Sequence, residues 1–179
     1  MNMSDRTAES RMAHAFGLEG GGWQRHTNPW SVYTRIPIPA MLALAVWSRA
    51  WIGWWCLAPI ALVCFWAAIN PQAFPPPASA DRWASKAVLG ETFWVRRNTV
   101  PIPRHHVRAC QLLLALNVGG VPLVVWGLVV LDVWLVVAGL VIHMTGKNWF
   151  LDRMVWLYQD MTGGNHPRPG VPDELLGGR

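Results

Sequence analysis

The stretch Ala109–Leu131 reads ACQLLLALNVGGVPLVVWGLVVL and contains no charged side chain in twenty-three residues. A second stretch, Ala50–Ile69, reads AWIGWWCLAPIALVCFWAAI and has no charge in twenty residues. A helix rises about 1.5 Å per residue, so each stretch is long enough to cross roughly 30 Å of hydrocarbon. The whole chain of 179 residues is 53% hydrophobic and only 14% charged. These features predict an integral membrane protein.

Each charge-free stretch continues into a second apolar segment beyond a polar position. As single helices, Pro39–Ile69 would measure about 46 Å and Ala109–Gly146 about 57 Å, which is too long for a bilayer without extreme tilt. We therefore expect the chain to fold back near Arg49 and near Asp132. The predicted fold is all-α, with four transmembrane helices arranged as two short-loop hairpins, at about 36–48, 50–69, 109–130 and 133–147.

The basic residues predict the orientation in the membrane. Of fifteen Lys and Arg, all but Arg49 lie in the N-terminal region, the central segment 70–108 with its flanks, or the C-terminal region. The positive-inside rule then predicts that both termini and the central segment face the cytoplasm. Both termini on one side require an even number of spans. This favours four over the alternative of three, in which Arg49 would snorkel from one long helix.

Thirteen tryptophans are distributed as interfacial anchors would be. Indole rings favour the headgroup region, where the apolar body points inward and the N–H reaches water. Those near the two predicted tips are Trp47, Trp51, Trp54, Trp55, Trp126 and Trp134. Those near the predicted cytoplasmic boundary are Trp30, Trp94, Trp149 and Trp156. The pattern supports an arrangement with two interfaces.

The N-terminal part of the membrane domain begins with a capped helix. Asn28–Pro29 has the form of a helix N-cap followed by Pro at the first helical position, and this helix is expected to break at Pro37–Pro39. No apolar segment precedes Ile36, so no cleavable signal peptide is predicted. We predict a mobile tail over 1–23, a single membrane domain over 24–161, and a flexible tail over 162–179.

Two further helices are predicted at the cytoplasmic surface. Trp83, Ala84, Ala87 and Val88 repeat at helical spacing, which predicts a short surface helix that ends at Gly90. The stretch 148–161 is amphipathic, as expected of an interfacial helix, and Gly163–Gly164 would stop it.

Three blocks of sequence are similar to a known family. They are HTNPWSVYTR at 26–35, WASKAVLGE at 83–91 and KNWFLDRMVWLY at 147–158. They resemble a family of small prokaryotic membrane proteins that is known only as a domain of unknown function, and the resemblance covers roughly residues 23–161. It implies a multi-span membrane protein and implies no activity, cofactor or residue role.

Polar side chains beside the membrane entry points suggest a metal site. Histidine nitrogen and carboxylate oxygen suit Fe or Zn, and folding into hairpins would bring the entry points together on the cytoplasmic side. The candidate ligands are His26, His105, His106 and Asp152, with Glu91 and Asp160 placed to orient the His rings. In the competing interpretation the carboxylates pair with Arg35, Arg96, Arg97 and Arg153, and no metal binds.

An ionisable residue inside an apolar segment is a functional candidate, and His143 is the one here. It lies only four residues before Lys147, so an interfacial position is the alternative. Small residues in the apolar segments indicate either a pore or close helix packing, and packing is the commoner role. They are Gly119, Gly120, Gly127 and Gly139.

Three classes of function remain open. The preferred hypothesis is an accessory or assembly subunit of a larger membrane complex, and the alternatives are a membrane-bound Fe or Zn enzyme and a small transporter or channel. The chain has no phosphate-binding loop, dinucleotide fingerprint or nucleophile elbow. The expected partners are the lipid bilayer and other membrane subunits. The isoelectric point of about 9.7 is explained by basic cytoplasmic segments that attract anionic lipid, so no nucleic-acid partner is expected.

Overall fold

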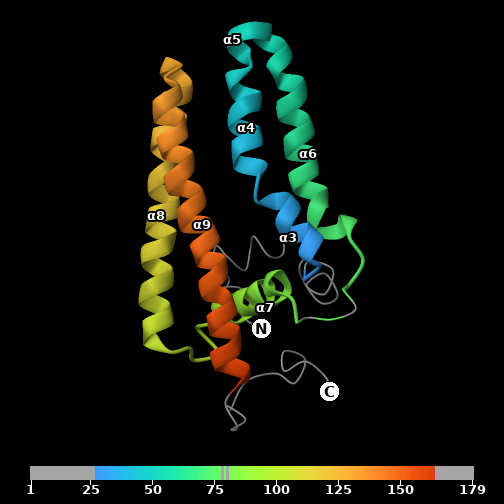
Figure 1. Ribbon diagram of the computed structural model, residues 1–179, viewed down its shortest axis with the longest axis vertical. Helices are drawn as coiled ribbons and strands as arrows, with labels where there is room; N and C mark the ends of the chain where they lie inside the picture. Colours follow the sequence, from blue (N-terminus) through green and yellow to red (C-terminus); the bar gives the residue numbers. More distant parts are fainter. Residues whose placement is uncertain (1–26, 78, 80, 164–179) are drawn as a thin grey trace, which may run out of the picture.

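The computed structural model of the chain describes residues 27–77, 79 and 81–163 (Figure 1). These residues form helices and no strand, so the predicted all-α class is confirmed for them. Two upright groups of helices stand side by side on a base, where α7 lies across their lower ends (Figure 1). The elements are α3 (Pro29–Arg35), α4 (Ile38–Trp47), α5 (Arg49–Ile52), the 3₁₀ helix η2 (Gly53–Cys56), α6 (Leu57–Ala73), α7 (Trp83–Val95), α8 (Arg104–Val130) and α9 (Val133–Thr162).

The first group begins with the capped helix that the sequence predicts. The side chain of Asn28 accepts a hydrogen bond from the Trp30 N–H at 2.9 Å, and Pro29 is the first residue of α3. The helix breaks before α4, where Pro37 takes the N-cap position. Both predictions are confirmed. The chain then turns over through α5 and η2 at Gly53, whose φ of +57° favours glycine.

The second group consists of α8 and α9, which run in opposite directions in contact with each other. Leu131 ends α8 in the left-handed conformation, at a φ of 57°. The carboxylate of Asp132 then accepts hydrogen bonds from the N–H groups of Trp134 at 2.9 Å and Leu135 at 3.1 Å. An N-cap of this kind satisfies backbone donors that a helix start leaves without partners. The chain therefore reverses at the position that the sequence predicts.

Glycines bring the backbones of α8 and α9 into close contact. A Cβ at Gly120 would lie 2.5 Å from the Gly139 carbonyl oxygen, and a Cβ at Gly127 would lie 2.7 Å from the Val136 nitrogen. The prediction that these three glycines are packing positions is confirmed. It is wrong for Gly119, where a Cβ would meet nothing within 4 Å. The two neighbouring glycines are on different faces of α8.

The tips of the two groups are joined through Arg49. Its guanidinium donates to the backbone carbonyl of Leu128 and, at 2.9 Å, to that of Val129. These carbonyls belong to the last turn of α8, where backbone acceptors have no helical donor and the helix dipole favours a positive charge. Arg49 thus caps the C-terminus of α8 from the opposite group.

The core of the described residues lies in the base, where α7 packs against the lower half of α9. A Cβ at Gly90 would lie 2.0 Å from the Met154 carbonyl oxygen, so α7 and α9 touch backbone to backbone there. The prediction that this helix ends at Gly90 is wrong. The glycine serves helix packing, and α7 continues to Val95. Trp94 is 5% exposed in this core, so its predicted role as an interfacial anchor is also wrong.

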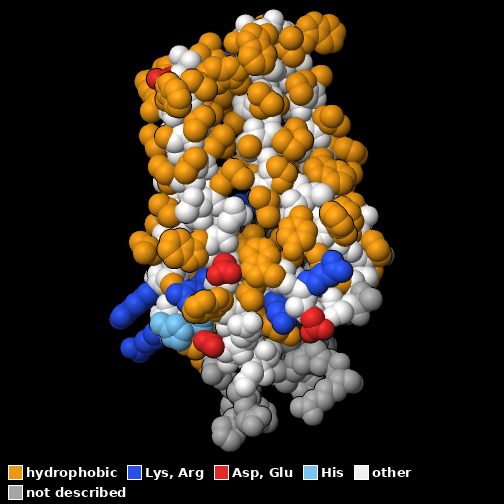
Figure 2. All heavy atoms as spheres, in the orientation of Figure 1, with side chains coloured by type: hydrophobic (Ala, Val, Ile, Leu, Met, Phe, Trp, Pro, Cys, Tyr) orange, Lys and Arg blue, Asp and Glu red, His pale blue; other side chains and the backbone are white. Residues whose placement is uncertain are grey.

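Among the residues that the structure describes, two helical stretches are long and apolar enough to cross a membrane, Pro29–Ala73 and Arg104–Val130. The first of these reverses direction within its length, at α5 and η2. In Figure 2 hydrophobic side chains cover most of the upper molecule, whereas nearly all charged and histidine side chains gather at the base. Large apolar side chains are exposed along this upper part of the molecule, which we call the shaft; among them are Leu62 at 69% and Leu112 at 71%.

Candidate functional site

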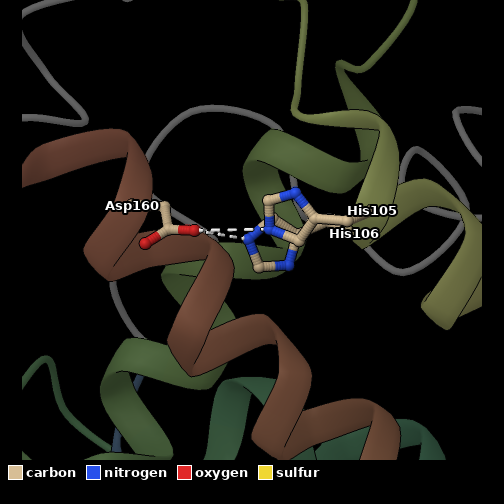
Figure 3. A group of neighbouring side chains, drawn as sticks. All are labelled: His105, His106 and Asp160. Carbon is tan, nitrogen blue, oxygen red and sulfur yellow. Dashed lines mark hydrogen bonds and ion pairs between the residues drawn. The ribbon is translucent and has the colours of Figure 1, made fainter.

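Two histidines and one aspartate meet at the base of the molecule. His105 and His106 lie in the first turn of α8, and Asp160 lies in the last turn of α9. Figure 3 shows both imidazole rings directed at the same carboxylate. One candidate ligand atom from each residue lies within 4.8 Å of the other two. The structure thus brings together two predicted ligands and one residue that was predicted to orient them.

The distances show which of the two imidazole rings makes a hydrogen bond to Asp160. The Nε2 atom of His106 lies 2.8 Å from Oδ2 of Asp160, which is a short hydrogen bond. The Nε2 atom of His105 lies 3.6 Å from the same oxygen. The two rings also contact each other, with centroids 4.2 Å apart. His106 is fully buried, while the side chains of His105 and Asp160 are 62% and 51% exposed.

The pKa values indicate a neutral ring bonded to an ionised carboxylate. Burial lowers the pKa of His106, and the hydrogen bond to Asp160 only partly opposes this. The hydrogen bond from His106 lowers the pKa of Asp160. Because an ionised carboxylate can only accept, the Nε2–H of His106 donates to Asp160. The remaining ring nitrogen, Nδ1, is buried without a hydrogen-bond partner.

This group has the composition of a metal site, and two of its members are joined by a hydrogen bond. Two imidazoles and one carboxylate are a ligand set found with Fe(II) and Zn²⁺. A metal would replace the proton that His106 and Asp160 now share. One feature weighs against tight binding: a ligating histidine usually donates its second N–H to a protein acceptor, and Nδ1 of His106 has none.

The other predicted ligands are placed differently. Nε1 of Trp83 donates to Oδ1 of Asp152 at 3.0 Å, which ties the start of α7 to α9. Asp152 is not among the residues that meet at the histidine pair. His26 lies outside the described residues.

The register between α8 and α9 explains which aspartate meets the histidines. Close backbone contacts pair position 120 with 143, 127 with 136 and 117 with 146, and each pair adds to 263. His106 is therefore level with position 157, about 4.5 Å along the axis from Asp160 and about 7.5 Å from Asp152. The turn at Leu131–Asp132 carries this information in the sequence, since antiparallel helices pair positions that are equidistant from their turn.

Glu91 occupies a second cluster of charges. It lines a cavity of about 90 Å³ together with Arg35, Lys147 and apolar side chains such as Val32 and Leu151. Burial raises the pKa of Glu91 to about 6, although the charges of Arg35 and Lys147 act in the opposite direction. Glu91 therefore belongs to an ionic cluster between α3, α7 and α9 and is absent from the group at the histidine pair.

His143 is held by the backbone of the neighbouring helix. Its Nδ1 lies 3.0 Å from the Asn117 carbonyl oxygen, and the Asn117 amide donates to the His143 carbonyl oxygen at 3.0 Å. A carbonyl oxygen only accepts, so Nδ1 carries the proton of this bond. The two hydrogen bonds fix the ring where Gly120 and Gly146 bring the backbones of α8 and α9 close together.

A polar network that the sequence analysis did not identify joins α3 to the end of α6. The hydroxyl of Ser31 donates to the Asn70 side-chain oxygen at 3.0 Å, and the Asn70 amide donates to the Thr34 hydroxyl at 2.7 Å. Ser31 and Asn70 are fully buried. The available signal was an asparagine at the end of an apolar run, because a buried amide needs hydrogen-bond partners.

The comparisons with known proteins place the chain in a family and assign no activity. No curated protein and no solved structure matches the chain. Residues 7–170 match the family described as "Family of unknown function (DUF6653)". This match covers most of the 179 residues and agrees with the resemblance seen in the three sequence blocks. The chain therefore belongs to this family of unknown function.

Proposed function

We propose that the chain is a four-span protein of the cell membrane, with both termini and α7 on the cytoplasmic side, and that it is an accessory or assembly subunit of a larger membrane complex. The observation that carries the proposal is the separation seen in Figure 2, an apolar shaft above a charged base. A soluble protein of this size rarely leaves so large an apolar surface in water.

The exposed tryptophans support two interfaces at the ends of the shaft. At the tips, Trp54, Trp55 and Trp134 are each more than three-quarters exposed. At the base, Trp149 and Trp156 remain more than half exposed beside the charged residues. Indoles concentrate at headgroup level because one end is apolar and the N–H needs water.

The lengths of the helices are consistent with four crossings of unequal kind. From Gly53 to Ala73 the chain rises about 30 Å, and α8 alone is about 40 Å long. The ten residues of α4 cover only about 15 Å, so the first crossing reaches the base with the help of α3. The fourth crossing is the upper half of α9, Val133–Lys147, which packs along α8.

The topology is tested with reporter fusions. Reporters placed after Arg179 and within the 75–81 segment should both report the cytoplasm, because the basic residues flank these segments. A reporter inserted at Asp132, on the opposite tip, is the matched control and should report the outside. A C-terminal reporter on the outside would contradict four spans and favour three.

The role as a subunit is supported by an apolar surface on the outer face of α9. A shallow groove there is lined by apolar side chains such as Val137, Val141 and Met144, and it ends at Asn148 and Trp149. A lipid-facing surface that carries small grooves and a polar end suits a neighbouring helix, since packing and interhelical hydrogen bonds drive association in membranes.

Purification in a mild detergent tests this role. We expect the native chain to co-purify with a defined partner without crosslinking, and Val141→Trp to lose that partner. Leu62→Trp, at an exposed position on α6, is the matched control and should retain it. A wild-type chain that purifies alone as a monodisperse particle from its own membrane would contradict the subunit role.

A second candidate function, a divalent-metal site, is favoured by the meeting of His105, His106 and Asp160. After expression with Fe and Zn supplied, the wild type should carry stoichiometric metal, and His106→Ala and Asp160→Ala should lose it. His26→Ala tests whether the N-terminal segment adds a ligand. Wild-type protein without metal would exclude the site, and metal that survives both of the first substitutions would lie elsewhere.

A further inference from the structure

A groove between the two helical groups ends at His143. It has a volume of about 240 Å³ and is lined on one side by Leu42, Ala43 and Val46 of α4, and on the other by Val121, Val124 and His143 of α8 and α9. The remaining lining side chains are also apolar. Imidazole is thus the polar group among the described residues of this groove.

The position of His143 places it at the lower, cytoplasmic end of the groove. It is level with position 120 of α8, whereas the α8 residues of the groove begin at Val121 and run upward to Leu128. One helical turn below it, Lys147 lines the cavity that also contains Arg35 and Glu91. A molecule in the groove would therefore have its polar end near the headgroup level and its apolar part deeper in the bilayer.

The hydrogen bond of His143 determines which chemistry the groove can bind. Nδ1 donates to the Asn117 carbonyl oxygen, so in the neutral ring the lone pair is on Nε2. Nε2 of His143 accepts no hydrogen bond from any described residue, and it is not among the fully buried polar atoms. An acceptor without a partner in an apolar groove favours a ligand that brings one hydrogen-bond donor.

The size of the groove limits the ligand further. Pockets that enclose a whole small molecule typically measure about 300–1,000 Å³. At about 240 Å³ the groove has room for a ring-sized head, and a longer tail would remain in the lipid. The exposed side chains of Val121 and Val125 form its rim.

We propose that this groove binds the ring of a lipid-soluble quinol, whose hydroxyl donates to Nε2 of His143. A quinol is a ring-sized, apolar molecule with an O–H donor, and its tail partitions into the bilayer. The oxidised quinone offers only carbonyl acceptors and cannot make this bond with an Nε2 that also accepts. The inference rests on the proposed membrane embedding, because the rim faces lipid only in that case.

Calorimetric titration of the purified full chain in detergent micelles tests the proposal. Decylubiquinol, kept reduced under anaerobic conditions, should bind saturably, and decylubiquinone should bind roughly tenfold more weakly or worse because a hydrogen bond is lost. His143→Phe, which keeps a ring and removes the acceptor, should weaken decylubiquinol by a similar factor. Leu112→Val, at an exposed position on α8 outside the groove, is the matched control and should bind as the wild type does.

Several outcomes would overturn the proposal. They are no saturable binding of decylubiquinol, equal binding of the quinol and the quinone, and unchanged binding in folded His143→Phe. The comparison of quinol with quinone uses wild-type protein, so it stands even if the variant does not fold. Binding in micelles does not depend on topology. If the reporters are cytoplasmic but decylubiquinol does not bind, the quinol site alone is refuted. If the reporters are on the wrong side, the membrane arrangement is refuted.

Discussion

Alanine substitutions at two neighbouring glycines should have opposite effects on stability. Gly119 and Gly120 are consecutive residues of α8, but only Gly120 faces α9. A Cβ at position 120 would lie 2.5 Å from the Gly139 carbonyl oxygen and 2.6 Å from the His143 nitrogen, and both atoms are backbone. A Cβ at position 119 would meet open space.

The magnitude follows from the contact distances. Ordinary van der Waals contact begins near 3.4 Å, so Gly120→Ala must separate the two backbones by almost 1 Å. Overpacking of this kind costs about 1–3 kcal/mol of unfolding free energy. Each variant also gains about 0.5–1 kcal/mol of helix propensity, since Ala replaces Gly within a helix. The propensity gain is common to both, so the difference between the variants measures the steric cost alone.

Equilibrium unfolding in mixed detergent micelles, followed by tryptophan fluorescence, measures this difference. Gly119→Ala should be slightly more stable than the wild type, and Gly120→Ala should be less stable than Gly119→Ala by about 1–3 kcal/mol. Helix separation should also loosen the paired hydrogen bonds between Asn117 and His143. If Gly120→Ala proves as stable as Gly119→Ala, the close approach of α8 and α9 is refuted.

Three further predictions concern polar contacts. Because burial raises the pKa of Glu91 from its ordinary value of 4.5 to about 6, the folded chain holds this proton more tightly, and stability should fall as pH rises from about 4.5 to 6. The loss of unfolding free energy is on the order of 2 kcal/mol, and Glu91→Gln should abolish it in unfolding measured at pH 4 and pH 7.5; equal pH dependence in the variant would contradict this. Asn70→Ala should lower the free energy of unfolding by about 1–3 kcal/mol, because it removes the side-chain acceptor of the buried Ser31 hydroxyl. Gln72→Ala, at an exposed position, should be neutral in the same unfolding assay. Arg49→Ala should lower unfolding free energy by roughly 0.5–1.5 kcal/mol through loss of the cap on α8, and a change within error would show that this cap adds nothing.

Local signals in the sequence predicted the elements well. The charge-free lengths of Ala50–Ile69 and Ala109–Leu131, the N-cap at Asn28 and the reversal at Asp132 each depend on residues within a few positions. Gly90 shows the limit of such signals. A glycine near the end of a periodic pattern is typical of a helix stop, yet here it allows α7 to touch the α9 backbone. Only the approach of another helix distinguishes the two roles.

The polar contacts could be predicted only in part, since each depends on a register between distant segments. Once the chain reverses between α8 and α9 at Leu131–Asp132, the pairing of the two helices brings His106 near Asp160. Asp152 lies about two helical turns above Asp160 on α9. Predicting the contact between His106 and Asp160 needs only the position of the turn and the continuity of α9. The bond from Arg49 to α8, across 80 positions, has no such rule, because it depends on how two separate helical groups lean together. Contacts within one pair of helices are therefore open to prediction from a sequence of this kind, and contacts between pairs, including the groove at His143, require the three-dimensional structure.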